Sequence, residues 1–308
     1  MRDKQHAPDD AQQLADRAAN LKGASIALFF GFIQVLNDSV MKTLVGELGF
    51  YQVLMVRGIA VLPVIILILL WRNELVTKLE GRDRHIMSLR VMCEVGLSYF
   101  MLKALATLPL AYVIIILQTV PFGLTVAAAI FYGEAVGMRR WLAIIVGFCG
   151  VLLIVKPGTQ QFQPEMLFAV TAAAIFVLRD MITRQLSAHV PTFYTVFLQL
   201  LGVTAFNLVM CFFDEWVPLA PHHYGLMVLA GVLFTLMTTS AILMMRFGDI
   251  SFVAQFRYSG IVWAVLIGAV LFGEIPDVIS VIGALVILAA GLYALHRERL
   301  AKARALTG

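Results

Sequence analysis

Long apolar runs recur along almost the whole chain, separated by short segments of charged and turn-forming residues. A bilayer core about 30 Å thick requires roughly 20 apolar residues from a spanning helix. Strands of a membrane barrel would instead alternate apolar and polar residues, a pattern these runs lack. The chain is 61% hydrophobic and 14% charged, whereas about a quarter of a soluble protein is charged. We therefore predict an all-α polytopic membrane protein.

Charged residues and turn signals divide the apolar sequence into segments long enough to cross a membrane. We predict ten transmembrane helices, in residues 23–45, 49–70, 86–107, 110–132, 140–156, 164–187, 191–213, 224–245, 250–272 and 277–296.

Lysine and arginine residues between these segments indicate which side of the membrane each connection faces. They concentrate in the two tails and in the connections on the same side as the tails, whereas Lys156 stands alone on the opposite side. Cytoplasmic connections carry the excess of basic residues. We therefore predict that both termini are cytoplasmic.

Two stretches with an offset of 140 residues share a pattern: residues 111–134 and residues 251–274 are both apolar and both end in Gly-Glu. Each half then holds five predicted helices, and because five is odd the second half enters the membrane from the opposite side. Many secondary transporters build a midplane site from such an inverted repeat. We divide the chain into an N-terminal tail (1–22), a first repeat (23–156), a second repeat (164–296) and a basic C-terminal tail (297–308).

Three motifs of the first half carry a resemblance to a known family. They read Y-F-M-L-K-A-L-A-T-L-P-L-A-Y-V from Tyr99, G-E-A-V-G-M-R-R-W from Gly133 and G-F-C-G-V-L-L-I-V-K-P-G from Gly147. The sequence resembles the drug/metabolite transporter superfamily, in its ten-helix group of two EamA domains. The resemblance implies a central cavity formed by the first, third, fourth, sixth, eighth and ninth helices, and a possible homodimer.

Each half also places an aspartate inside an apolar run: V-L-N-D-S-V-M-K contains Asp38 and V-L-R-D-M-I-T-R contains Asp180. An aspartate near the centre of a spanning helix costs about 2.5–3.5 kcal/mol, so it should face the bundle interior and have a partner. We expect Asp38 and Asp180 to line a translocation cavity, with Arg57 as an ion-pair partner of Asp38. The residue before the aspartate differs between the two motifs: it is Asn37 in the first and Arg179 in the second. Lys42 and Arg184, four residues after each aspartate, could equally line the cavity or pair locally and snorkel to the interface.

Other polar side chains fall on the helices that the resemblance assigns to the cavity. Gln118 and Tyr258 occupy equivalent positions in the two halves, and an amide and a phenol there could bind a polar head group. Trp263 could stack on a planar part of a substrate; interhelical hydrogen bonding is the structural alternative for any one of these residues. The predicted substrate-binding set is Asn37, Asp38, Arg57, Tyr99, Gln118, Arg179, Asp180, Gln255, Tyr258 and Trp263.

Two positions are candidates for hinges. Pro121 removes a backbone hydrogen bond and should kink the fourth helix. Gly260 is its neighbour in the repeat, since Ile261 stands where the first half has the proline.

Two further acid patterns have local interpretations. Arg90 and Glu94, one turn apart, indicate a pair within the third helix. Glu134 and Glu274 stand before the fifth and tenth helices, where a carboxylate can cap exposed N–H groups.

The sequence argues against several classes of function. There is no P-loop, no nucleophile–base pair and no buried histidine relay. The adjacent His222 and His223 in a predicted outer connection are a weak metal signal. We expect no cofactor, no metal and no nucleic-acid partner, because the basic residues sit in short loops and tails.

We predict a secondary active or facilitative transporter that moves a small polar, amino-acid-like metabolite by alternating access, as an exporter in the inner (plasma) membrane of a bacterium. The partners would then be the small-molecule substrate and the lipid bilayer. An importer of a vitamin of the riboflavin type is the alternative within this class. A membrane-embedded transferase is the alternative of another class, and it would need a polar catalytic loop that the sequence does not offer.

Overall fold

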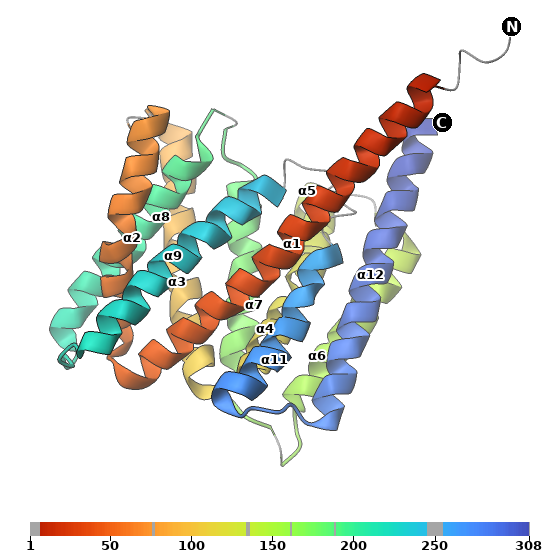
Figure 1. Ribbon diagram of the computed structural model, residues 1–308. Coiled ribbons are helices and arrows are strands. Elements are labelled where there is room, and N and C mark those ends of the chain that lie inside the picture. The colour runs from red at the N-terminus through yellow and green to blue at the C-terminus, as the bar shows by residue number, and fades with distance from the viewer. Residues whose placement is uncertain are drawn as a thin grey trace, which may run out of the picture.

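The computed structural model describes residues 7–75, 78–133, 136–160, 162–187, 189–244 and 255–307, with side chains between residues 19 and 241 and between 255 and 297. Within these ranges the chain is helical and contains no strand (Figure 1). The α-helices are α1 (Ala7–Glu47), α2 (Phe50–Arg72), α3 (Gly81–Thr107), α4 (Leu110–Leu117), α5 (Val120–Tyr132), α6 (Met138–Val155), α7 (Met166–Thr183), α8 (Thr192–Met210), α9 (Pro221–Met244), α11 (Ser259–Phe272) and α12 (Val278–Thr307). Two 3₁₀ helices, η1 (Cys211–Phe213) and η2 (Gln255–Tyr258), extend α8 and precede α11.

These helices make ten passes through the bundle, because α4 with α5 and η2 with α11 each form one pass. Nine passes in the described chain are long and apolar enough to span a membrane by length and composition. The tenth pass is α3, whose hydropathy is lowered by charged residues: Arg82, Asp83, Arg84, Arg90, Glu94 and Lys103. The predicted all-α polytopic architecture is confirmed.

The second half of the bundle runs opposite to the first. In Figure 1, α1 descends from the end that carries both termini, whereas α7 ascends toward that end. The closest helix pairs join the halves, with α6 against α12, α3 against α7, α1 against α9, and α2 against α8. The interior is therefore built mainly from contacts between the two halves.

The fourth pass is interrupted at Gln118 and Thr119, directly before Pro121. The proline lacks an N–H and interrupts the helical hydrogen bonding, and at the interruption the carbonyl of Ile116 accepts hydrogen bonds from the Thr119 N–H at 3.1 Å and the Thr119 hydroxyl at 2.6 Å. In the second half, the helix type changes from 3₁₀ to α between Tyr258 and Ser259, which is the equivalent point without a proline. Both interruptions lie within the bundle, where protein atoms can satisfy the freed backbone groups.

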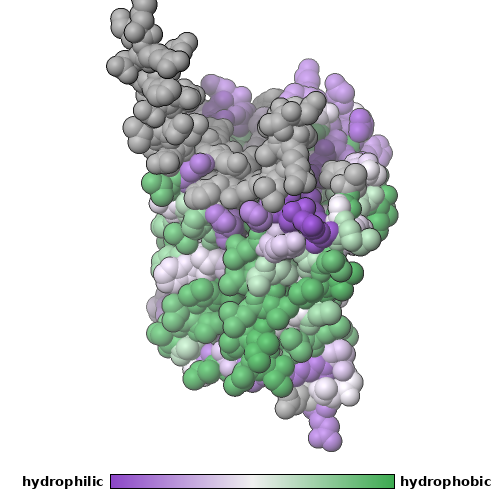
Figure 2. Space-filling model, turned by 90° about the vertical axis from the view of Figure 1, so that its right-hand side faces the viewer, coloured by the Kyte–Doolittle hydropathy of each residue, from purple (hydrophilic) through white to green (hydrophobic). Residues whose placement is uncertain are grey.

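The outer surface is apolar through the middle of the molecule. Figure 2 shows a broad hydrophobic band between hydrophilic ends. Large side chains that would be buried in a soluble protein are exposed here, among them Phe131, which is 75% exposed, and Val270, which is 81% exposed. Such a surface matches a hydrocarbon environment. The polar ends of α1 and α12 extend the helices beyond the predicted spans, which begin at residue 23 and end at residue 296.

Candidate functional site

Three neighbouring cavities lie inside the bundle and share wall residues. The vestibule, of about 540 Å³, lies beside the first turn of α6 and the end of α7, two helix ends that point toward the end of the bundle with the termini (Figure 1). It is lined by residues that include Pro121, Arg140, Asp180, Thr183, Arg184, Tyr258 and Gly291. The middle cavity, of about 240 Å³, shares Pro121, Asp180 and Tyr258 with it. The charged cavity, of about 180 Å³, shares Gln34, Leu117 and Phe176 with the middle cavity.

The aspartate of α1 lines the charged cavity and is almost fully buried. Asp38 is 8% exposed, and Asn37 beside it is 4% exposed. The Asn37 amide donates to Asp38 Oδ1 at 3.3 Å. Asp38 Oδ2 and Asn37 Oδ1 have no hydrogen-bond partner in the structure. Two residues that line one small cavity thus each have a buried acceptor without a donor, which is a costly arrangement unless a ligand supplies one.

Arg57 of α2 reaches the same cavity from the opposite wall. Its guanidinium lies 5.4 Å from the centroid of the Phe234 ring, and its Nε has no hydrogen-bond partner. Among the described residues, Arg57 makes no ion pair within 4.0 Å. The expected Asp38–Arg57 ion pair is therefore wrong: the two charges interact electrostatically across the cavity but are not in contact.

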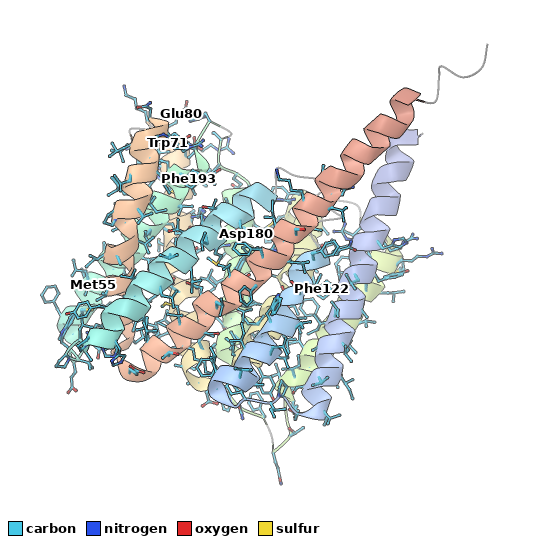
Figure 3. All side chains as sticks on the ribbon, in the orientation of Figure 1. Met55, Trp71, Glu80, Phe122, Asp180 and Phe193 are labelled. Carbon is cyan, nitrogen blue, oxygen red and sulfur yellow. The ribbon has the colours of Figure 1, made fainter. Side chains whose placement is uncertain are left out.

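The second arginine of the charged cavity is fully engaged. Arg179 of α7 bonds to Glu94 Oε2 of α3 at 3.0 Å and to Asp180 Oδ1 at 2.7 Å. The predicted local pair of Arg90 with Glu94 is wrong, because Arg90 instead donates to Thr183 and Gln199 across the helix interface. Asp180, labelled in Figure 3, lines both the vestibule and the middle cavity. Arg179 bonds to its Oδ1, and its other oxygen has no hydrogen bond to a described residue.

The middle cavity contains the two helix interruptions. Gln118 donates from Nε2 to the carbonyl of Arg257 at 2.9 Å, so the two interruptions are tied together. A Cβ atom at Gly260 would lie 3.3 Å from Gln118 Nε2, which explains a residue without a side chain there. Tyr258 also lines this cavity, and its ring packs against the backbone of Gly291. Arg257 lies over the Phe30 ring at 5.4 Å.

Three residues of the predicted set lie away from these cavities. Tyr99 packs edge-on against Phe50 and Phe100. Trp263 contacts Phe32 at 4.9 Å, and its Nε1 has no hydrogen-bond partner. Gln255 lies in η2 and contributes to none of the three linings.

Several cavity residues were missed by the sequence analysis. Gln34 lines two cavities, and its position four residues before Asp38 places it on the same helix face, a signal that was available. Phe176 and Phe234 form apolar wall next to the arginines, but phenylalanine is too common in a membrane chain to stand out. Arg257 was not selected either, because its position beside a cavity depends on tertiary packing.

Comparison with known proteins identifies the architecture. The EamA-like transporter family matches residues 21–156 and residues 163–295, together most of the chain. The chain belongs to the EamA-like transporter family. It is therefore a multi-pass membrane protein of a family of metabolite transporters.

Named relatives of this EamA-like transporter differ in substrate. A riboflavin transporter of Vibrio cholerae is 30% identical over 63% of this chain and 65% of its own length. An S-adenosylmethionine uptake transporter of Rickettsia bellii is 26% identical over 65% of this chain and 68% of its own. A pseudopaline exporter of Pseudomonas aeruginosa is 28% identical over 61% and 66%. The chain thus spans just under two thirds of the first relative's length.

A solved crystal structure of a protein has the same fold as this EamA-like transporter. The two superpose with a TM-score of 0.62 over 92% of this chain and 99% of the other, at 21% identity. At that identity the likeness shows the fold alone.

At the end of the transporter away from the termini, polar contacts join the two halves. Lys42 of α1 bonds to Glu274 at 2.8 Å and to the carbonyl of Leu108. Glu274 also accepts the backbone N–H of Leu110, the first residue of α4, at 2.8 Å. Lys42 was expected either to line the cavity or to pair locally and snorkel to the interface. Neither interpretation holds, because Lys42 lines none of the three cavities and binds Glu274 of the other half. Glu274 caps α4 rather than the last helix, and Glu134 lies outside the described residues.

A second cross-half contact lies beside the first. Lys156 bonds to Asp277 Oδ1 at 3.0 Å, and the Tyr112 hydroxyl donates to Asp277 Oδ2 at 2.8 Å. Asp277 also caps α12 by accepting the N–H groups of Ile279 and Ser280. Burial, which raises the pKa of Asp277, is outweighed by hydrogen bonds from Ser280, Lys156 and Tyr112, which hold that pKa below its usual value.

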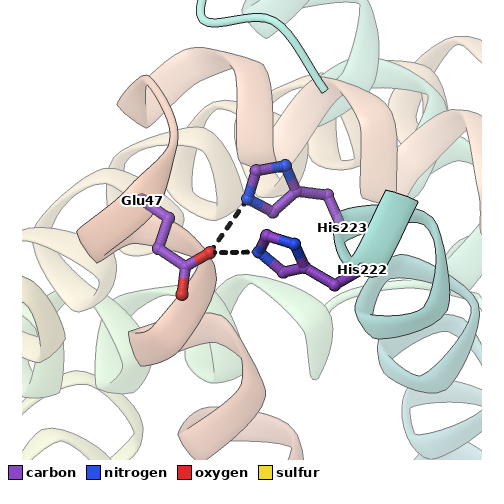
Figure 4. A group of neighbouring side chains, drawn as sticks. All are labelled: Glu47, His222 and His223. Atoms are coloured by element: carbon purple, nitrogen blue, oxygen red, sulfur yellow. Dashed lines mark hydrogen bonds and ion pairs between the residues drawn. The ribbon is translucent and has the colours of Figure 1, made fainter. Parts of the chain in front are cut away.

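A third cross-half contact involves the adjacent histidines. Glu47 Oε2 lies 2.7 Å from His222 Nε2 and 2.9 Å from His223 Nε2 (Figure 4). The N–H of Ala220 donates to His223 Nδ1 at 2.9 Å, so the ring proton of neutral His223 is on Nε2 and is donated to Glu47. A metal would need the lone pair that this proton occupies. The cluster is therefore a hydrogen-bonded contact between the halves rather than a metal site with three ligands.

Proposed function

We propose that this chain moves a small polar, amino-acid-like metabolite across the bacterial inner membrane by alternating access, with export as its net direction. The observation that carries this is the series of three adjoining cavities with charged side chains in their walls, which begins beside the ends of α6 and α7 on the side of the termini and is followed on the other side by contacts between the halves. A transporter caught open to one side needs this combination.

The inverted repeat supplies a physical reason for alternation. The two repeats, 23–156 and 164–296, are the halves we propose to move, and near-equal halves can exchange conformations at little net free-energy cost. With cytoplasmic termini, the vestibule opens to the cytoplasm, so the described state would load substrate from inside, as an exporter does.

The relatives support both directions. One group is named for uptake of S-adenosylmethionine, another as riboflavin transporters and another as exporters of pseudopaline. Uptake of a vitamin of the riboflavin type is therefore the second candidate.

Reconstitution in proteoliposomes tests the proposal. Labelled amino acids, riboflavin and S-adenosylmethionine are loaded inside or supplied outside, and flux is followed with and without an imposed pH gradient. We expect saturable movement of an amino-acid-like compound. Movement of riboflavin alone would favour the second candidate, and movement of no compound would contradict the proposal.

The orientation is tested by cysteine labelling in cells. Single cysteines at the exposed positions Arg82 and Thr159, in a variant lacking Cys93, Cys149 and Cys211, are treated with an impermeant maleimide. We expect labelling from outside at position 159 and not at position 82. The reverse result would place the vestibule on the outer side.

A further inference from the structure

Arg57 and Arg257 make no ion pair with a described residue, and each lines one of the two inner cavities together with an aspartate. Each of these two groups contains an arginine stacked over a phenylalanine and an aspartate with a free oxygen. From this juxtaposition we propose two successive binding stations for an amino-acid-type zwitterion, an inference that rests on the proposed transport function and names the substrate class.

The inner station is the charged cavity. Asp38 Oδ2 and Asn37 Oδ1 are buried acceptors without a donor, and an ammonium group carries three N–H donors. Arg57 lines the same cavity with a guanidinium that makes no hydrogen bond to any described residue. A guanidinium binds a carboxylate through two parallel hydrogen bonds. One zwitterion would therefore satisfy both poles.

Neighbouring charges leave these two poles available. Arg179, the other arginine of this cavity, is bonded to Glu94 and Asp180. These two carboxylates neutralise its charge, so it should compete little for the ligand's carboxylate. Asp38 and Arg57 do not neutralise each other by contact, since no ion pair joins them. In a site of low dielectric constant, separated charges of opposite sign favour a dipolar ligand over a ligand of one sign.

The outer station is the middle cavity. Arg257 lines it, stacks on Phe30 at 5.4 Å and has no hydrogen-bond acceptor for its guanidinium among the described residues. Asp180 lines the same cavity and the vestibule; Arg179 occupies only its Oδ1, which leaves the other oxygen for an ammonium. The wall between the two stations is formed by Gln34, Leu117 and Phe176.

The size of the cavities limits the ligand. At about 180 and 240 Å³, both lie below the roughly 300–1,000 Å³ typical of drug-sized pockets. Each station fits a group of amino-acid size, and a larger substrate would have to occupy both.

The test measures binding by the purified transporter, apart from transport. Isothermal titration is performed in detergent with each of the twenty L-amino acids and, for those that bind, with the N-acetyl derivative and the methyl ester. The first derivative lacks the ammonium and the second lacks the carboxylate. We expect two binding sites for a free amino acid and at least about tenfold weaker binding of either derivative.

Variants assign the stations. Arg57→Gln should abolish binding at the inner site and retain binding at the outer site, and Arg257→Gln should have the opposite effect. Arg72→Gln, at the exposed end of α2, should retain binding at both sites. Asp38→Asn should bring the affinities for the amino acid and its N-acetyl derivative at the inner site close together. Arg57→Lys, which keeps the charge, should retain part of the binding and guards against loss by misfolding.

Three results would overturn the inference: no amino acid binds, either derivative binds as well as its parent, or only one arginine variant changes the stoichiometry. Transport of riboflavin without binding of any amino acid would contradict the stations and leave a transporter. Binding that follows the expected pattern without flux of any compound would contradict the proposed function and leave the stations.

Discussion

The interior arginines differ in what satisfies their charge. Arg179 is held by two carboxylates, and Arg90 by a hydroxyl and an amide. Arg57 and Arg257 have only a phenylalanine face within reach of the described chain. A cation–π contact is worth about 2 kcal/mol when desolvated, less than a buried charge costs. We infer that Arg179 and Arg90 stabilise the fold, whereas Arg57 and Arg257 are the arginines that the proposed binding stations use.

Loss of Arg179 should destabilise the protein strongly. Arg179→Ala leaves Glu94 and Asp180 facing each other without a cation, and we expect a loss of about 3–5 kcal/mol. Arg72→Ala, which removes an exposed pair with Glu74, should cost at most about 1 kcal/mol. Thermal unfolding in detergent, followed by tryptophan fluorescence, compares the two.

The double variant Arg179→Ala with Glu94→Gln provides the control. Neutralising one of the two carboxylates should recover part of the stability lost in Arg179→Ala. Equal unfolding temperatures for Arg179→Ala and Arg72→Ala would contradict the structural role of Arg179.

At the scale of elements, α6 and α12 meet through glycines. A Cβ atom at Gly283 would lie 2.7 Å from the carbonyl oxygen of Gly150, which is backbone and cannot turn away. Close approach of this kind is how transmembrane helices gain packing contacts without a hydrophobic driving force. Gly150 and Gly283 thus allow α6 and α12 to approach closely within one chain.

Gly283→Ala should therefore force α6 and α12 apart. We expect a loss of about 1–3 kcal/mol from overpacking. Gly46→Ala is the matched control, because a Cβ at that helical position meets nothing within 4 Å and should be neutral or stabilise by up to about 1 kcal/mol. Unfolding temperatures of both variants in the same detergent decide the point; a larger loss for Gly46→Ala would refute it.

The start of α12 should respond to acid. The pKa of Asp277 is lower in the folded protein than in the unfolded chain, so its contribution to stability is complete above the unfolded value near 4 and is lost as pH falls below it. Asp277→Asn should lower the unfolding temperature at pH 7. The difference from the unsubstituted protein should shrink as pH falls below about 4. A difference that is constant from pH 7 to pH 3 would contradict this account.

The helices could be predicted from the sequence because an apolar run of about 20 residues indicates directly that the segment is surrounded by the hydrocarbon core of the membrane. Helix ends were less predictable: α1 and α12 continue into polar sequence, since leaving the membrane does not end a helix. The sequence predicted that Asp38 and Asp180 lie within membrane-spanning helices, but it did not predict the residues that they contact. The i, i+4 spacing pointed Lys42 at Asp38, whereas helix packing brings it to Glu274. Contacts between residues more than 200 positions apart leave no local pattern.

At the scale of the whole molecule, the two ends of the bundle differ. One end has the vestibule, and the other has the contacts of Lys42 with Glu274, Lys156 with Asp277, and Glu47 with the histidines. All of these contacts join one half to the other. They must break if the cavities are to open toward that end.

Weakening one contact should shift the population of states. Lys42→Glu places two like charges together, and a loss of about 1.4 kcal/mol from the closed arrangement would raise the open population about tenfold. The exchanged variant, Lys42→Glu with Glu274→Lys, should restore the closed arrangement. A cysteine at Gln34 in the cavity wall, introduced in the variant without native cysteines, reports this through its rate of labelling from the side away from the termini.

The labelling rates are compared among the starting protein, Lys42→Glu and the exchanged variant, all at matched folding yield. Faster labelling in Lys42→Glu, returned to the starting rate by the exchange, is the expected result. An unchanged rate would mean that this contact does not hold the halves together.

The length of α1 has a practical consequence. Its 41 residues correspond to about 60 Å of continuous helix, roughly twice the thickness of a bilayer core. A compact soluble domain joined in helical register to its first turns would be held at a fixed angle to the membrane bundle. Small transporters give electron microscopy few features for image alignment, and this helix offers a rigid place to attach one.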